Sequence, residues 1–321
     1  MRKDVKASSI AIRRNGVRIR KALEVCNLAK HSQHLVRNAL PLRVLGLDVN
    51  TNSTGFAIVT ERGLVCRWGH IPTAQFASDD VLRIGGAVDD YLATVQDAEQ
   101  QQQPSARWVV GIEAYLRMFR SGRFHNAGIF QLAQLNGIVS FSCWKRFNVL
   151  PLHTHPSAAR GYFGLSTASG SSGKKSNIKH QVMQFFEQQE PEVARKAEIA
   201  GQHAEGLEAL PRLKRMRSGA LADSAFDVAD AYVIAAYTRC AYLQKQLEIQ
   251  HPQLVKYFSA RYLELTYEAA AKTKKSSKEM TILKAMDEKE VFAYTRELFA
   301  FGLENWFKDH NKCFMLYDGK S

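Results

Sequence analysis

Four acidic residues attached to apolar segments are the residues of this sequence best suited to catalysis. Asp48 and Glu113 each end an apolar run, and Asp227 and Asp230 lie within the apolar segment 225–236. Ionised carboxylates are costly in such surroundings unless they are paired or bind a metal ion. Carboxylate oxygens are ligands that Mg²⁺ and Mn²⁺ prefer. The four acids therefore predict a site for two divalent ions, an arrangement that activates water and hydrolyses phosphodiester bonds.

The spacing of the last two acids supports a shared site. Asp230 follows Asp227 by three residues, so a helix would place both on one face, and Asp223, about one turn earlier, could join them. On most helices an Asp-x-x-Asp pair simply faces solvent. Here the flanking residues are apolar, and this favours a metal site over a solvated face.

The predicted elements explain how acids distant in sequence could meet. Short β-rich runs separated by turn residues predict an antiparallel meander of three strands, followed by helices that alternate with two more strands. We expect strands over 43–49, 54–60, 63–71, 108–112 and 149–153, and helices over 79–98 and 124–147. The glutamine tract at 100–103 predicts a surface linker. If the strands ending in Asp48 and Glu113 are parallel neighbours, both acids lie at one sheet edge, where a later helix could add Asp227 and Asp230.

Four segments resemble the motifs of RuvC-type Holliday-junction resolvases in order, spacing and chemistry. Residues 46–59 resemble the first motif of that family, and residues 110–113 resemble its second acidic strand. Residues 132–137 are similar to the helix behind that strand, and residues 227–235 resemble the final acidic helix. The resemblance covers about residues 43–240.

This resemblance implies an α/β fold of the ribonuclease-H-like type, in which a mixed sheet with a three-strand antiparallel meander and parallel strands is flanked by helices. It implies a homodimer that uses Mg²⁺ or Mn²⁺ to cut two opposed strands of a four-way (Holliday) DNA junction. Carried onto the matching positions, it makes Asp48, Glu113, Asp227 and Asp230 the catalytic metal ligands. Branched DNA is the expected partner, and structured RNA is a second polyanion that these acids do not distinguish from it.

Basic and aromatic residues near these motifs are candidate contacts to nucleic acid. The loop after Glu113 interleaves arginines with aromatic residues, which suits a grip on phosphates and a wedge against unstacked bases. The same aromatics could instead cap the core or form a dimer interface. Lysines after the Gly/Ser-rich stretch 164–173 could contact phosphates, and Lys175 resembles a family residue in that role, but they could also begin a solvated helix. The candidates are Arg117, Phe119, Arg120, Arg123, Arg160, Lys174, Lys175 and Lys179.

Histidines and cysteines do not indicate a zinc centre. His153 and His155 follow the fifth expected strand and could assist at the acidic site, but Pro156 breaks their spacing and no cysteine cluster accompanies them. The five cysteines are odd in number, widely spaced and without a Cys-x-x-Cys pair. This pattern also argues against a disulfide framework.

Positive charge is concentrated near the N-terminus. Residues 1–41 contain ten Lys or Arg residues and two acids, a net charge of +8 out of the +13 of the whole chain. This Arg-rich, acid-poor stretch predicts a transit peptide for a mitochondrion or plastid, although a basic arm that stays attached and touches nucleic acid has the same composition. Residues 42–249 are the predicted nuclease domain, and residues 250–321 a helical extension. No run of about 18 apolar residues occurs, so we expect no membrane span.

Two other functions share parts of this pattern. A resolvase-like protein could act on organelle RNA or in mitochondrial ribosome maturation, with cleavage redirected or lost. An actin-like or sugar-kinase-type ATPase also begins with a strand, an Asp and a loop rich in Gly and Thr, which residues 48–55 partly match. The further Gly-rich phosphate loops that such ATPases need are not found in the sequence.

Overall fold

The computed structural model describes residues 15–38, 41–114, 126–165, 178–187, 216, 222–273 and 278–315. The chain divides into two compact units. One is an α/β unit, formed by Ala39–Ala241 with Met315–Ser321, and the other is a helical unit, formed by Met1–Asn38 with Tyr242–Phe314. The long helix α9 (Asp223–Gln250) contributes residues to both units.

A mixed five-stranded sheet forms the centre of the α/β unit. Its strands lie in the order β3-β2-β1-β4-β5, with β1 antiparallel to β2, β2 antiparallel to β3, and β4 parallel to both β1 and β5. The strands are β1 (Leu42–Asp48), β2 (Ser53–Val59), β3 (Val65–Pro72), β4 (Arg107–Glu113) and β5 (Leu152–Thr154). The predicted α/β class, with a three-strand meander followed by parallel strands, is therefore confirmed.

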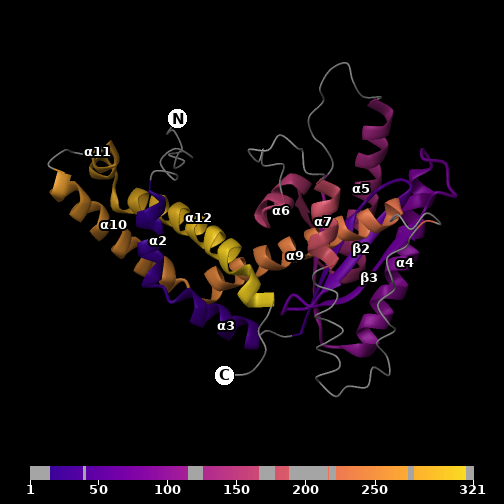
Figure 1. Ribbon diagram of the computed structural model, residues 1–321, viewed down its shortest axis with the longest axis horizontal. Coiled ribbons are helices and arrows are strands. Elements are labelled where there is room, and N and C mark those ends of the chain that lie inside the picture. The colour runs from indigo at the N-terminus through magenta and orange to yellow at the C-terminus, as the bar shows by residue number, and fades with distance from the viewer. Residues whose placement is uncertain are drawn as a thin grey trace. The chain divides into compact units, whose positions relative to one another are not determined.

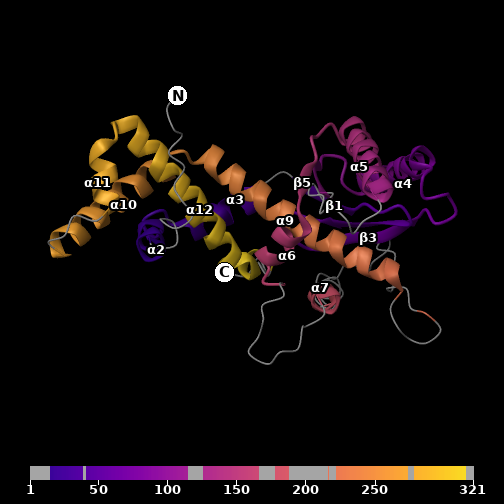
Figure 2. The ribbon, with the colours of Figure 1, turned by 90° about the horizontal axis from the view of Figure 1, so that it is seen from above.

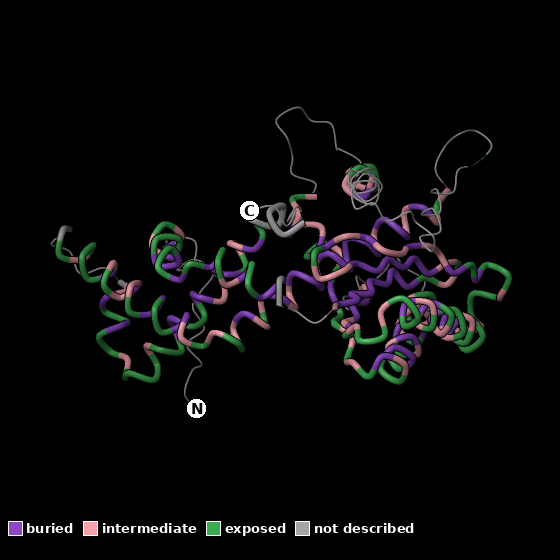
Figure 3. The backbone as a smooth tube through the Cα atoms, turned by 90° about the horizontal axis from the view of Figure 1, so that it is seen from below, coloured by how far each residue is buried: buried purple, intermediate pink, exposed green. Residues whose placement is uncertain are grey.

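Helices cover both faces of this sheet. Helices α4 (Val81–Gln102) and α5 (Asn126–Phe147) lie on one face, and α9 lies on the other (Figures 1 and 2). Helices α6 (Pro156–Tyr162) and α7 (Ile178–Glu187) are on the α9 side, where Phe186 of α7 contacts Trp68 of β3 and Tyr232 of α9. Figure 3 shows buried backbone along the strands of this unit, and central residues of α9, such as Ala231, Tyr232 and Ala235, are buried as well.

Alternation along the strands separates the two faces. Leu45 and Leu47 of β1, together with Val110 and Ile112 of β4, are buried in one hydrophobic core with residues of α4 and α5. Because successive side chains of a strand point to opposite faces, the residues between and after them point toward α9. Gly85 of α4 meets the side chain of Ile138 of α5, so the lack of a side chain at this position lets the two helices pack closely.

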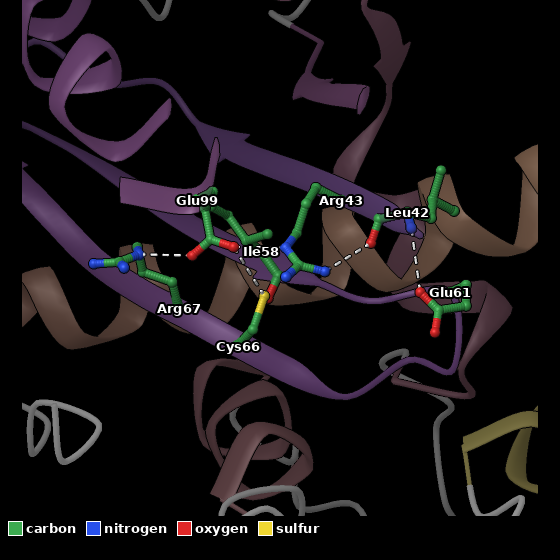
Figure 4. Close-up of polar contacts among 7 residues, drawn as sticks. All are labelled: Leu42, Arg43, Ile58, Glu61, Cys66, Arg67 and Glu99. Atoms are coloured by element: carbon green, nitrogen blue, oxygen red, sulfur yellow. Dashed lines mark hydrogen bonds and ion pairs between the residues drawn. The ribbon is translucent and has the colours of Figure 1, made fainter. Parts of the chain in front are cut away.

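Helix α4 is longer than the sequence predicts. It continues through the glutamine tract to Gln102, so the expected surface linker at 100–103 is wrong. The reason is Glu99, which is 1% exposed and accepts hydrogen bonds from Arg43 Nε at 2.5 Å and Arg67 Nε at 2.9 Å (Figure 4). Burial and the Glu99 carboxylate also raise the pKa of the Cys66 thiol to about 12. The ion pairs fix the end of α4 to β1 and β3.

Replacing Glu99 by glutamine should destabilise the α/β unit by about 3 kcal/mol, because two arginines would lose their shared counter-charge in a buried site. The matched control is Arg83→Ala, which breaks an exposed Arg83–Asp80 pair at 3.3 Å and should change stability by less than about 0.5 kcal/mol. Urea denaturation measures both. Equal small effects would show that the Glu99 pairs contribute nothing net.

The helical unit consists of segments from both ends of the chain. It contains α2 (Gly16–Glu24), α3 (Leu28–Asn38), α10 (Gln253–Thr273), α11 (Lys278–Ala285) and α12 (Glu288–Met315), together with the end of α9. The sequence expectation of a helical region after residue 250 is met by α10 to α12. Phe258 and Tyr262 are buried there, whereas Tyr257 and Tyr267 are more than half exposed. Among the described helices, none combines the length and hydropathy needed to cross a membrane.

Candidate metal centre

Strand register brings the first two acids together. In the parallel pair of β1 and β4, Gly46 lies opposite Gly111 and Leu47 lies opposite Ile112. Asp48 and Glu113 are the next residue of each strand and end their strands at the same edge of the sheet. Because Leu47 and Ile112 face the core with α4 and α5, the two acids face α9.

Two glycines let α9 approach the sheet at backbone distance. A Cβ at Gly46 would overlap the backbone of Ala231 and Ala235, and a Cβ at Gly55 would overlap the backbone carbonyl of Asp227. Any larger residue at these two positions would push the helix away from β1 and β2. The close approach therefore sets how far Asp227 and Asp230 lie from the acids on the strands.

Each of the four carboxylates has a defined contact. Asp48 shares a side-chain hydrogen bond with Glu113. Ser53 Oγ donates to Asp227 Oδ2. Arg160 of α6 donates to Asp230 Oδ1 from Nε at 3.0 Å and forms an ion pair with the same oxygen from its terminal nitrogen at 2.8 Å. Asp48, which is 9% exposed, thus contacts Glu113 directly and interacts with Asp227 and Asp230 through their charges.

Burial raises the pKa of every acid in this group, and repulsion from neighbouring carboxylates raises it further for Asp48, Glu113 and Asp227. Desolvation is the largest cause for all four, and the charges of Glu113, Asp230 and Asp227 raise the pKa of Asp48 further, well above its usual range. The hydrogen bond acts in opposite directions on its partners, since it raises the pKa of Asp48 and lowers that of Glu113. A hydrogen bond between two carboxyl groups needs one proton, which Asp48 and Glu113 share.

Three cationic or titratable side chains partly offset this negative charge. Arg160 lowers the pKa of Asp230 and of Glu113, and Lys179 of α7 lowers the pKa of Asp227 and of Asp230. Lys179 Nζ lies 5.2 Å from the centre of the Phe226 ring, just before Asp227. His155, which caps α6, lowers the pKa of Glu113. Of the two histidines noted in the sequence, His155 is thus the one near the acids, whereas His153 contacts Ser140 of α5.

The donor set suits hard divalent cations, although it is not arranged as a ligand shell. Carboxylates are the oxygen ligands that Mg²⁺ and Mn²⁺ prefer, and a cation would offset the burial and the repulsion that raise the pKa of Asp48 and Asp227. With the acids paired as above, no three His, Cys, Asp or Glu side chains within the described residues are grouped in a metal-holding geometry. A metal ion held by these residues would compete with the proton shared by Asp48 and Glu113 and with the Arg160–Asp230 ion pair.

Three residues near the acids were not singled out as site residues by the sequence. Besides Ser53, Asn136 of α5 donates its Nδ2 to the backbone oxygen of Glu113 at 2.8 Å. Thr154 lies opposite Glu113 in the β4–β5 register, is 4% exposed, and its Oγ1 has no hydrogen-bond partner among the described residues. Ser53 and Asn136 fall within the motif segments, which was the signal that could have identified them.

Most of the other predicted nucleic-acid contacts lie outside the described residues. These are Arg117, Phe119, Arg120, Arg123, Lys174 and Lys175. Arg160 and Lys179, by contrast, lie beside the acids as described above. Comparison of the chain with protein-family models, with curated proteins and with solved structures found no match in any of the three.

The raised carboxyl pKa values predict an unusual pH dependence of stability without metal. An acid whose pKa is higher in the folded than in the unfolded protein contributes stability below the unfolded pKa, about 4, and loses it as pH rises through the folded value. In EDTA, Asp48→Asn should therefore melt about 3 °C or more above wild type at pH 7.5, with the difference vanishing near pH 4. Mg²⁺ should reverse the order. Thermal denaturation at the two pH values measures this, and a destabilised Asp48→Asn at pH 7.5 in EDTA would contradict it.

Proposed function

We propose that the chain is a metal-dependent, structure-selective endonuclease of the RuvC type, with a ribonuclease-H-like fold, that resolves four-way DNA junctions in a mitochondrion or plastid. The observation that carries this proposal is the convergence of Asp48, Glu113, Asp227 and Asp230 at one sheet edge, on the face that α9 covers. The four acids come from the segments that resemble the resolvase motifs, and in the same order. Their raised pKa values support a site in which ionised carboxylates are unfavourable until a cation offsets their charge.

The chain's own residues have distinct roles in this proposal. Asp48, Glu113, Asp227 and Asp230 would hold two Mg²⁺ or Mn²⁺ ions, which activate a water and stabilise the leaving 3′ oxygen. Ser53 orients Asp227 through its hydroxyl, and Asn136 holds the backbone at Glu113. Both contacts reduce the freedom of the acids before substrate arrives.

Arg160 and Lys179 are suited to the scissile phosphate. Both are placed next to the acids, and both would find a new anionic partner when a phosphate enters. Arg160 would exchange Asp230 for a phosphate oxygen, which frees that carboxylate for metal. Lys179 is positioned by its contact with the Phe226 ring, next to Asp227.

A homodimer would supply two such centres, as paired cuts across a junction require. The excess of positive charge, +13 over the chain, supports a polyanionic substrate. The candidate contacts Arg117, Arg120, Arg123, Lys174 and Lys175 would add to this attraction.

Cleavage of a labelled four-way DNA junction by the full-length chain tests the proposal. The substrates are the junction, a linear duplex of the same sequence and a structured RNA, each with Mg²⁺, with Mn²⁺ and with EDTA. The expected result is metal-dependent, paired cuts at the junction and little cutting of the duplex. If only the RNA were cut, and only with metal, the proposed nuclease activity would stand but its substrate would be RNA instead of DNA. Binding to branched DNA with no cleavage in either metal would overturn the proposal.

A further inference from the structure

Helices α2 and α3 are an integral part of the folded helical unit. On these two helices Ile19, Ala22, Leu23, Leu28 and Leu35 are all at most 7% exposed. Helix α2 packs against α10. The thiol of Cys26, between the two helices, donates to the backbone oxygen of Leu254 at 3.6 Å. A transit peptide that is cleaved off does not need a face that packs within the folded protein.

A cluster of polar contacts joins the two ends of the chain at Glu279. One oxygen of this carboxylate, Oε1, accepts hydrogen bonds from Asn15 at 2.9 Å, from Tyr262 at 2.6 Å and from Tyr294 at 3.1 Å. Its other oxygen pairs with Arg18 at 2.8 Å. The donors come from the N-terminal segment, from α10 and from α12, so the carboxylate is satisfied only when all three are assembled.

Arg18 and the start of α2 make further contacts with the C-terminal helices. Arg18 donates to Thr266 Oγ1 at 3.1 Å and lies over the Tyr262 ring, 5.9 Å from its centre. On α12, Gly302 lies directly against Ile19 and Leu23, since a Cβ at this position would come within 2.6 Å and 2.9 Å of their side chains. Removing α2 would therefore expose apolar surface on α10 and α12 and leave Glu279 without two of its partners.

From this packing we infer that the mature protein keeps residues 15–38, and that any cleavage which removes a targeting segment occurs before Asn15. The Arg-rich composition of residues 1–41 does not distinguish a transit peptide that is removed from a segment that is retained. The burial of α2 and α3 does distinguish them. The helical unit forms only with α2 and α3 in place, so a cut behind them would unfold it. This inference is independent of the proposed nuclease activity.

The N-terminus of the mature chain tests the processing boundary. The full-length chain with a C-terminal affinity tag is expressed in eukaryotic cells and recovered from their mitochondria and cytosol, and its first residue is identified by mass spectrometry. The expected N-terminus lies at or before Asn15 in either fraction. An N-terminus at any later residue in the recovered folded protein would overturn the inference.

Two truncations test whether the helical unit needs these helices. Hydrogen exchange is followed in residues 254–262 and 298–307, and the sheet strands serve as the internal reference. Deletion of residues 1–14 should leave protection unchanged, whereas deletion of residues 1–38 should lower protection in those segments by about tenfold or more while the strands stay protected. Equal protection in the two truncations would show that α2 and α3 are dispensable.

A pair of substitutions in the full-length chain provides a second test, which applies even if the variant lacking residues 1–38 cannot be expressed. Ala22 is fully buried and Lys21 beside it is exposed, so Ala22→Asp and Lys21→Asp introduce the same charge in opposite settings. Only Ala22→Asp should reduce protection in residues 254–262 and 298–307. The same behaviour of both variants, whether loss or retention, would contradict the inference.

Discussion

Asp227→Asn is expected to lower junction cleavage in Mg²⁺ by about 1,000-fold or more, because the asparagine cannot replace a charged ligand of the ions that activate water and stabilise the leaving oxygen. Binding to the junction should stay within about threefold of wild type, since the substitution removes a negative charge from the surface proposed to meet phosphates. Asp48→Asn should behave in the same way. Cleavage is measured under single-turnover conditions and binding by fluorescence anisotropy in EDTA.

The matched control for this experiment is Asp223→Asn. Asp223 is on the same helix, one turn before Asp227, but its side chain is exposed. We expect its cleavage rate to fall by less than about tenfold, which is the effect of a long-range charge rather than of a lost ligand. If Asp223→Asn and Asp227→Asn lost cleavage equally, or if Asp227→Asn lost binding and cleavage together, the acids would not form the centre proposed above.

Gly46→Ala is expected to destabilise the α/β unit by about 3 kcal/mol, because the added methyl group would overlap the backbone of α9 at Ala231 and Ala235. A backbone cannot rotate away as a side chain can, so α9 must shift as a whole. The shift would also move Asp227 and Asp230 away from Asp48 and weaken metal binding. Urea denaturation and titration with Mn²⁺ measure the two consequences.

Gly137→Ala is the matched control, with the same change of one methyl group. Gly137 is within α5 and nothing lies within 4 Å of the position where its Cβ would be. Alanine has the higher helix propensity, so this variant should be neutral or more stable by about 0.5 to 1 kcal/mol. A Gly46→Ala protein as stable as Gly137→Ala would mean that α9 does not lie against β1 as closely as described.

The sequence by itself determined the elements and the four acids. Strand alternation and turn residues are local properties, so the meander and the parallel strands could be predicted to within a few residues. The acids could be identified because a carboxylate at the end of an apolar run is costly without a partner. The glutamine tract showed the limit of this reasoning. Its polarity indicated a linker, but α4 continues to Gln102, and Glu99 just before the tract is held by Arg43 and Arg67.

Only the tertiary structure decided which partners these residues have. The pairing of Asp230 with Arg160, and of Asp227 with Ser53, depends on the close approach of α9 to the glycines of β1 and β2. The place of α2 in the helical unit depends on contacts with Glu279 and Gly302, more than 250 residues away in the chain. Composition and periodicity describe neighbours along the chain, whereas burial and charge pairing are set by neighbours in space. For that reason the acids were visible in the sequence, and their contacts, together with the fate of the N-terminal segment, were not.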